Sequence, residues 1–222
     1  MPSRPIRLLP SLLNHKLFYQ QTDGGFGFTA QGRRDIAINI DKREIFRVGL
    51  LDPLLAIMAE YRNEIEAIEI INEPDLIVYE TYPYVRPAVA IEFIEMVASS
   101  IRLHGLPVML GTRFSNLVRE WNLANITPQS HQYDGTLSIA DPSSTILAEF
   151  GSIALPGESG PWPNLSILEK YRVAARAGYP ISCVWSRYSS SGHHGDRYIW
   201  SESFEEEILA FTTGVVSVAH LR

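Results

Sequence analysis

Two glutamates stand at the ends of apolar runs, where a buried strand would meet a loop. Glu73 ends the run IEAIEIIN at residues 65–72, and Glu149 ends the run STILA at residues 144–148. A buried, unpaired carboxylate is unfavourable, so a fold that keeps one at a strand end commonly uses it. Two glutamates at the same end of two parallel strands can point into one pocket. Such a pair is typical of glycoside hydrolysis, in which one carboxyl group is an acid and the other a nucleophile or base.

Further polar and aromatic residues follow other apolar runs, and they are His15, His131, Tyr133 and Trp185. Side chains at the C-terminal ends of several strands are typical of a binding or catalytic site on a parallel α/β fold. The adjacent pair His193-His194 lacks spaced carboxylates or cysteines, so we expect no metal site. Glycoside hydrolysis by two carboxyl groups needs no cofactor, so none is expected.

Short apolar runs alternate with longer segments of helical periodicity along the chain. Strands are predicted at 6–14, 65–71, 107–114, 126–134, 144–151 and 180–188. Helices are predicted at 43–62 (with a break at Gly49 or Pro53), 86–105, 115–124, 163–179 and 204–220. Residues 19–32 are predicted to form a polar loop. Such alternation predicts a parallel sheet with right-handed crossovers. We therefore read residues 1–222 as one α/β domain.

An open doubly wound sheet and a barrel both fit this order of elements. A nucleotide-binding sheet would carry a glycine-rich phosphate loop after a strand, whereas GGFGF at 24–28 lacks the spacing and follows a polar stretch. Polar residues at the ends of several different strands favour a TIM barrel, because its βα loops build the site.

Four short motifs in this order resemble the clan of retaining β-glycosidases on TIM barrels, which includes cellulases, β-mannanases and many β-glucosidases. The matching residues are Asn72-Glu73-Pro74, His131-Gln132-Tyr133, Glu149-Phe150-Gly151 and Trp185. In that clan these motifs close the fourth, sixth, seventh and eighth strands. The resemblance covers roughly residues 6 to 190.

The resemblance implies that Glu73 is the general acid/base and Glu149 the nucleophile of a double displacement. It also implies that Asn72 hydrogen-bonds the 2-hydroxyl group of the sugar, an interaction that strengthens in the transition state. The expected substrates are β-linked glucosides, galactosides, mannosides or short oligosaccharides.

The remaining motif residues receive supporting roles from the same resemblance. Tyr133 would orient or protect the nucleophile, and His131 would line the site near the acid/base. Trp185 would stack under a sugar ring. His15 corresponds to a histidine that some members carry after the third strand.

If residues 65–72 are the fourth strand, the sequence lacks the first two βα units, including the arginine that the clan places on its second strand. We therefore expect six-eighths of a barrel, with open strand edges near residues 9 and 183. Open edges invite pairing with another chain, so a two-fold homodimer is expected, or completion by a separately encoded chain. Without the arginine, weak or relaxed activity is expected.

Composition limits the other partners. The net charge is −6 without a cluster of basic residues, which argues against nucleic acid as a partner. No apolar stretch approaches the ~20 residues that span a membrane. The N-terminus lacks the features of a cleaved signal peptide and Cys183 is the single cysteine, so a cytoplasmic location is expected.

Two other functions stay open. A non-catalytic carbohydrate-binding or structural remnant of a glycosidase would use aromatic residues near the predicted C-terminal loops: Tyr79, Tyr82, Tyr84, Trp162, Tyr188 and Trp200. An aldolase would need a lysine at a strand end to form a Schiff base, and no predicted strand ends on one.

Overall fold

The computed structural model describes residues 7–15, 30–79, 85–113, 116–132, 141–150, 160–162 and 164–182, except the side chains of residues 30–33, 77, 79, 149 and 167. The chain divides into two compact units, Met1–Pro128 and Gln129–Arg222. Each unit is described by itself below. The predicted last helix, at residues 204–220, lies outside the described residues.

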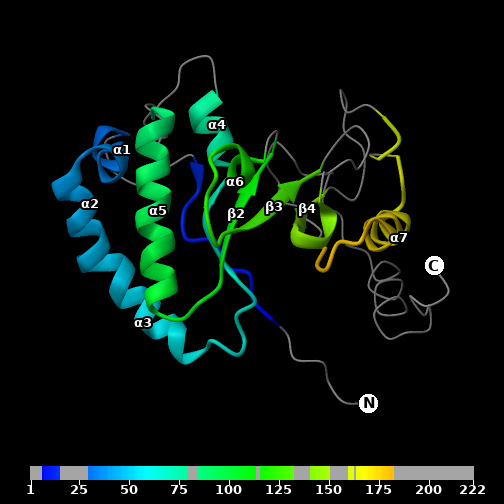
Figure 1. The fold of residues 1–222 in the computed structure, drawn as a ribbon, viewed down its shortest axis with the longest axis horizontal. Helices are drawn as coiled ribbons and strands as arrows, with labels where there is room; N and C mark the ends of the chain where they lie inside the picture. Colours follow the sequence, from blue (N-terminus) through cyan, green and yellow to red (C-terminus); the bar gives the residue numbers. More distant parts are fainter. Residues whose placement is uncertain are drawn as a thin grey trace, which may run out of the picture. The chain divides into compact units, whose positions relative to one another are not determined.

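Four strands form one sheet: β1 (Ile68–Asn72), β2 (Val108–Thr112), β3 (Thr127–His131) and β4 (Ile146–Glu149) (Figure 1). Their order in the sheet is β1-β2-β3-β4, so each strand lies beside the next in the sequence. β1 pairs with β2 in parallel, and β3 pairs with β4 in parallel. Every residue of β1 and β2 is buried, as expected of strands covered on both faces. These four strands confirm four of the predicted ones.

Residues 7–15 extend the sheet beyond β1 without forming a regular strand. Isolated parallel bridges join Leu8 to Ile65, Ser11 to Glu69 and Asn14 to Asn72. The register shifts by one residue after the first bridge, at Pro10, which has no N–H group to donate and contributes only its carbonyl oxygen to Glu69. The predicted strand is therefore an interrupted edge, although its position and direction are as predicted.

The opposite edge begins with Ser182, which bridges Leu147 of β4 in parallel. The Leu147 N–H group donates to the Ile181 carbonyl oxygen at 3.0 Å. This pairing places the start of the predicted strand 180–188 beside β4. The rest of that strand, with Cys183 and Trp185, lies outside the described residues.

A long helical segment follows the edge in sequence and contains a π-helical turn. Its parts are α2 (Ile40–Phe46), the π-helix η2 (Arg47–Leu51) and α3 (Asp52–Glu60). The turn lies where the sequence predicted a break, because the ring of Pro53 crowds the preceding turn and supplies no N–H group. The preceding helix α1 (Ala30–Ile38) was not predicted.

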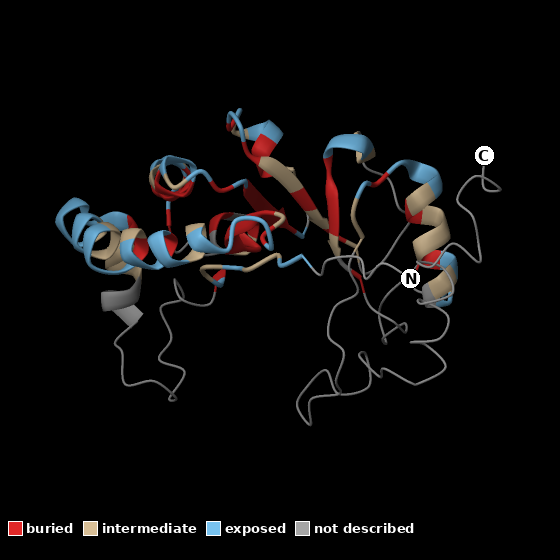
Figure 2. Ribbon diagram, turned by 90° about the horizontal axis from the view of Figure 1, so that it is seen from below, coloured by how far each residue is buried: buried red, intermediate tan, exposed pale blue. Residues whose placement is uncertain are grey.

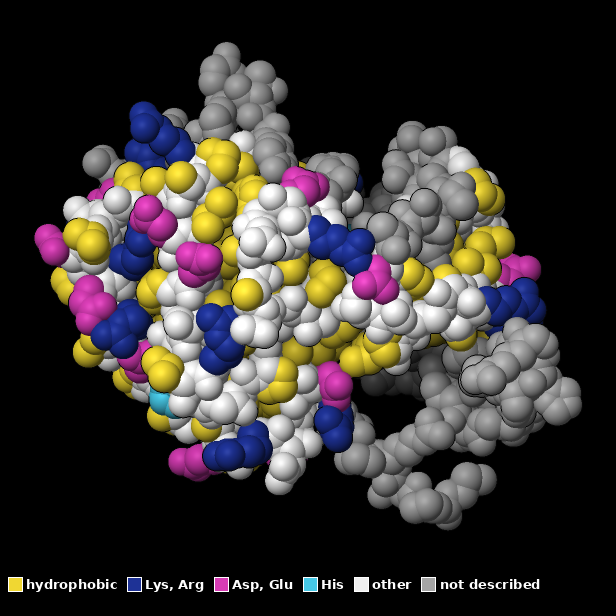
Figure 3. All heavy atoms as spheres, viewed as in Figure 1, with side chains coloured by type: hydrophobic (Ala, Val, Ile, Leu, Met, Phe, Trp, Pro, Cys, Tyr) yellow, Lys and Arg dark blue, Asp and Glu magenta, His cyan; other side chains and the backbone are white. Residues whose placement is uncertain are grey.

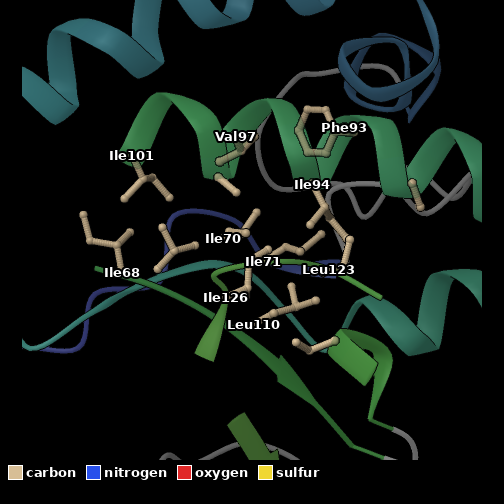
Figure 4. Close-up of a cluster of buried hydrophobic side chains, with 14 of the residues drawn as sticks. Ile68, Ile70, Ile71, Phe93, Ile94, Val97, Ile101, Leu110, Leu123 and Ile126 are labelled. Carbon is tan, nitrogen blue, oxygen red and sulfur yellow. The ribbon is translucent and has the colours of Figure 1, made fainter. Parts of the chain in front are cut away.

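The core of unit 1 lies between these helices, α5 (Pro87–Leu103) and the strands (Figure 1). Phe93, Ile94, Val97 and Ile101 follow helical spacing on α5, and Figure 4 shows them next to Ile68, Ile70 and Ile71 of β1. Figure 2 shows the buried residues gathered on the strands and on the inward side of the helices. α5 therefore ends where predicted and covers β1 and β2.

The end of α5 explains the glycine at position 105. Gly105 has a φ of +71° and its N–H group donates to the Arg102 carbonyl oxygen, while the Leu106 N–H group donates to that of Ile101. This pair of bonds is a Schellman motif, which needs a left-handed residue after the helix. The predicted stop at Gly105 is confirmed.

We expect Gly105→Ala to lower the free energy of unfolding by about 1 kcal/mol, because the left-handed conformation strains a residue with a Cβ atom. The added Cβ meets nothing within 4 Å, so strain is the only term. The matched control is Gly49→Ala, in η2, where φ is not left-handed and the Cβ also meets nothing within 4 Å. That variant should gain about 0.5 kcal/mol or more. Urea unfolding of both would show opposite signs, and equal signs would contradict this account.

Four shorter elements complete the description: α4 (Pro74–Tyr79), α6 (Leu117–Glu120), the 3₁₀ turn η3 (Pro142–Ser144) and α7 (Ile167–Ala177). α6 is shorter than the predicted helix 115–124, and the Asn116 side chain caps it by accepting from the Arg119 N–H group. α7 begins with a capping box formed by Ser166 and Glu169 and ends at Gly178, whose φ is +95°. In the described part of the chain no helix is both long and apolar enough to cross a membrane.

Candidate active site

The C-terminal end of β1 places Glu73 in an unusual backbone conformation. Glu73 has a φ of +54°, and its N–H group donates to the Gly111 carbonyl oxygen of β2 at 3.2 Å. Pro74 then starts α4, so the chain turns sharply at the glutamate. A left-handed residue other than glycine, asparagine or aspartate is uncommon, and such strain concentrates at functional sites. Glu73 is 7% exposed, so its carboxyl group lies inside the fold as the sequence predicted.

His15 lies beside this glutamate because Asn14 bridges Asn72 at the edge of the sheet. The Nδ1 atom of His15 is 3.2 Å from the Asn72 carbonyl oxygen and 3.7 Å from Oε2 of Glu73. Both side chains are buried. A proton on Nδ1 is thus held by the Asn72 carbonyl group, and a doubly protonated ring also attracts the Glu73 carboxylate. The structure brings His15, Asn72 and Glu73 together in unit 1.

The side chain of Asn72 carries a buried acceptor. Asn72 is 9% exposed, and its Oδ1 atom accepts no hydrogen bond from the described residues. Buried polar atoms are nearly always paired, and an unpaired one is destabilising by about 1–3 kcal/mol. A ligand with a hydroxyl or amine donor would satisfy this oxygen.

Asp75 belongs to the same region and was not predicted from the sequence. It is almost fully buried, and its Oδ2 atom accepts from the Arg113 N–H group at 2.9 Å. The carboxylate therefore links the start of α4 to the loop after β2. The signal in the sequence is an acidic residue in the first turn after Pro74, which also favours a helix start.

Unit 2 contains His131 and Glu149, two further residues of the predicted site. Their Cα positions are in register across β3 and β4, and both residues end their strands. His131 is buried, and its Nε2 atom lies 3.1 Å from Nε2 of Gln129. The side chain of Glu149, together with Tyr133 and Trp185, lies outside what the structure describes. The backbone of Glu149 is therefore at the predicted strand end, and the direction of its carboxyl group stays a prediction.

Trp162 holds the ends of β3 and β4 together. Its indole N–H group donates to the Gln132 carbonyl oxygen at 3.0 Å, and its ring meets Phe150 edge-on at a centroid distance of 5.7 Å. Tyr171 packs edge-on against the other side of this cluster, 5.3 Å from Phe150. Trp162 is 1% exposed, so it is a core residue of unit 2 and not one of the aromatic residues available to a sugar, as one alternative predicted.

Lys170 of α7 completes this cluster and was also missed. Its side chain is almost fully buried, and Nζ lies 6.0 Å from the centroid of the Trp162 ring. Burial lowers the pKa of Lys170 to about 8 from an ordinary value of 10.5. In the sequence, Lys170 is one more residue of the predicted helix 163–179. The apolar periodicity of that helix does not show whether position 170 faces the core or the solvent.

This shift predicts a pH dependence. Between pH 8 and 10.5 the unfolded chain binds a proton at Lys170 that the folded chain does not, so a rise in pH removes a cost of folding. We expect the free energy of unfolding of the wild type to rise between pH 8 and 10.5 relative to that of Lys170→Met, which has no titrating group at this position. The difference between the two proteins should therefore change with pH over this range. Urea unfolding across this range would contradict the prediction if the difference stayed constant.

Among the described residues, no group of three or more His, Cys, Asp or Glu side chains is placed to hold a metal ion. The polar groups that the described residues do place at strand ends are carboxyl, amide and imidazole groups. They are suited to proton transfer and to hydrogen bonding with hydroxyl groups.

A comparison with solved structures finds a β-mannanase from the blue mussel Mytilus edulis, with a TM-score of 0.59 and 14% sequence identity. The match covers 92% of this chain and 67% of the mannanase chain. No protein-family model matches the sequence, and no curated protein matches it. At this identity the likeness shows the fold alone. The predicted fold class, an α/β incomplete TIM barrel with parallel strands, is confirmed.

Proposed function

We propose that this chain is a retaining glycoside hydrolase that cleaves β-linked glycosides with Glu73 as acid/base and Glu149 as nucleophile. The glycosidase-like fold supports this proposal, as do two glutamates at the C-terminal ends of β1 and β4. The observation that carries it is the strained, buried Glu73 next to the unpaired Asn72 amide oxygen.

In the first step, the Glu149 carboxylate attacks the anomeric carbon and the glycosidic C–O bond breaks. Glu73 gives its proton to the departing oxygen, so the leaving group departs as a neutral alcohol. In the second step, Glu73 takes a proton from water, and the water oxygen displaces Glu149 from the anomeric carbon. This mechanism requires the two carboxyl groups to lie ~5–5.5 Å apart. No cofactor takes part.

The cluster in unit 1 gives two residues a part in this chemistry. Oδ1 of Asn72 would accept from a sugar hydroxyl group, which removes the cost of the unpaired oxygen when substrate binds. His15, with Nδ1 3.7 Å from Glu73, would hold the carboxyl group in one orientation through both protonation states. His131, Tyr133 and Trp185 keep the roles that the resemblance implies.

The sugar is a β-glucoside, β-galactoside or β-mannoside in this proposal, and the β-mannanase likeness puts β-mannosides first. A non-catalytic sugar-binding role is less well supported. Its aromatic cleft would include Trp162, which is buried in the core of unit 2.

The test is hydrolysis of aryl β-mannosides, β-glucosides and β-galactosides, and of short β-mannan oligosaccharides, by the purified chain. The double variant Glu73→Gln/Glu149→Gln, prepared in parallel, measures contaminating activity. Turnover of at least one substrate that the double variant lacks is expected. Folded protein without turnover on any substrate would overturn the proposal, and binding of the same sugars without turnover would favour the non-catalytic role.

A further inference from the structure

Asp75 is a buried acidic residue next to the strained turn at Glu73. Acidic side chains are mostly found at the surface of a protein, and Figure 3 shows several of them on one face of this molecule. Asp75 is only 1% exposed, and its Oδ2 atom accepts from the Arg113 N–H group at 2.9 Å. A carboxylate inside a fold needs hydrogen bonds that replace its lost water. The role of Asp75 therefore depends on what this hydrogen bond holds in place.

The bond to Arg113 takes the place of a backbone bond of the sheet. Asn72 pairs with Gly111 in the parallel ladder of β1 and β2, and the Glu73 N–H group donates to the Gly111 carbonyl oxygen at 3.2 Å. In a regular parallel ladder, the next bond would run from the Arg113 N–H group to the Glu73 carbonyl oxygen. The Arg113 N–H group donates to Asp75 instead. A side-chain oxygen of Asp75 thus replaces the carbonyl oxygen of Glu73 in the ladder.

This replacement leaves the Glu73 carbonyl group available for the turn into α4. Its oxygen accepts from the Leu76 N–H group at 3.1 Å, at the start of that helix. Pro74 lies between the two residues and has no N–H group that needs an acceptor. The chain can therefore leave the sheet at Glu73 while the N–H groups of Arg113 and Leu76 are both hydrogen-bonded.

The left-handed backbone of Glu73 depends on these bonds. Its φ of +54° is unfavourable for a residue with a Cβ atom, and a residue before proline also favours the extended region. Such strain persists only where the surrounding structure enforces it. Without the Asp75 oxygen, the Arg113 N–H group could pair with the Glu73 carbonyl group, and the ladder would continue by one bond. Glu73 would then become extended, and its side chain would point in a different direction.

We propose that Asp75 is a positioning residue, which fixes the direction of the Glu73 carboxyl group by replacing the Glu73 carbonyl oxygen in the sheet. This inference rests on the proposed function, in which Glu73 is the acid/base. Proton transfer requires the acid to be within hydrogen-bond reach of the departing oxygen, so a small displacement of Glu73 slows the reaction. Asp75 itself touches no reacting atom.

The kinetic test compares Asp75→Ala with Asp75→Asn. Both variants remove the negative charge, but only asparagine keeps an oxygen that can accept from the Arg113 N–H group. For a phenyl β-glycoside, whose leaving group needs a proton, kcat/KM should fall about 10–100-fold in Asp75→Ala and less than about 3-fold in Asp75→Asn. For the dinitrophenyl β-glycoside, whose leaving group needs none, kcat/KM should fall less than about 3-fold in both variants. A merely structural role would lower kcat/KM equally for the two substrates.

The matched control is Asp41→Ala, the same change at an exposed position in the first turn of α2. It should leave kcat/KM unchanged for both substrates. If Asp75→Ala does not fold, Asp75→Leu replaces it, because leucine fills the same space without an acceptor. Equal losses for the two substrates in the variant without an acceptor, or an equally large loss in Asp75→Asn, would overturn the positioning role while Glu73 remained the acid/base.

Amide hydrogen exchange of the full chain tests the same arrangement without a substrate. In Asp75→Ala, either Arg113 loses its acceptor or it takes the Glu73 carbonyl oxygen from Leu76. Exchange at one of these two N–H groups should therefore be at least about 10-fold faster than in the wild type, and it should be unchanged in Asp75→Asn. Unchanged exchange at both groups in Asp75→Ala would overturn the proposal. The expected exchange in a folded chain without turnover would overturn the proposed function and support the role of Asp75 at this turn.

Discussion

Glu149→Gln is expected to lower kcat/KM for aryl β-glycosides by about 10³-fold or more, because the amide cannot form the glycosyl-enzyme. Glu73→Gln should lower it by about 10²–10⁴-fold for substrates with a poor leaving group. A dinitrophenyl leaving group departs without a proton. With such a substrate, the rate of the first step should fall much less in Glu73→Gln. Steady-state kinetics with a series of aryl leaving groups would separate the two roles.

The matched control is Glu95→Gln, an identical change at an exposed position of α5, and it should leave kcat/KM unchanged. A 2-fluoro-glycoside with a good leaving group offers a second readout, since the fluorine slows release of the covalent intermediate. Mass spectrometry should find the sugar on the peptide that contains Glu149 in the wild type and in Glu73→Gln, but not in Glu149→Gln. Labelling of another residue would refute the assignment of the nucleophile.

Trp162→Ala is expected to lower the free energy of unfolding by about 3–5 kcal/mol. The indole is 1% exposed and packs on Phe150, and its N–H group donates to the Gln132 carbonyl oxygen. Its removal leaves a large cavity between the ends of β3 and β4 and breaks the hydrogen bond to the Gln132 carbonyl oxygen. Because Phe150 follows Glu149 directly, catalytic activity should also fall in the protein that remains folded.

The comparison variant is Trp162→Phe, which keeps an aromatic ring and loses the hydrogen bond. It should lose about 1–3 kcal/mol, since the hydrogen bond from the indole N–H group to the Gln132 carbonyl oxygen is lost. Urea unfolding monitored by circular dichroism would measure both variants. A loss below 1 kcal/mol in Trp162→Ala would contradict the role of the indole as the core of unit 2.

The strands were predictable because short apolar runs are a strong local signal. Every residue of β1 and of β2 is buried, and strands of this kind have short apolar runs in the sequence, which located both of them. Residues 6–14 were predicted as a strand from the same signal. Pro10 interrupts the hydrogen-bonded ladder there, because it has no N–H group to donate. Whether a proline breaks a strand depends on whether a carbonyl group of the neighbouring strand lies opposite it.

The unpredicted helices lack that signal. α1 begins in a polar stretch that follows GGFGF, and its mean composition is polar, so nothing in the residues distinguishes it from a loop. α4 is a six-residue helix that starts at Pro74. The triplet Asn72-Glu73-Pro74 was interpreted as the end of a strand, so no helix was predicted there. Both helices are selected by packing against the sheet or its neighbours, which local propensity does not contain.

Residues of the candidate site could be predicted where they belong to a sequence motif. Asn72 and Glu73 came from a triplet at a strand end, and His15 from its place after the preceding run. Asp75 and Lys170 came from neither source, because a buried carboxylate or ammonium group looks like a surface residue until its neighbours are known. Three-dimensional contacts between distant segments decide these positions.

The central claim is that Glu73 and Glu149 perform a double displacement, and the stereochemistry of the product tests it most directly. Proton NMR of the first product released from an active β-glycoside, before mutarotation, distinguishes the anomers. We expect the β anomer, because two inversions at the anomeric carbon restore its configuration. Initial release of the α anomer would show a single displacement by water and would contradict the role given to Glu149.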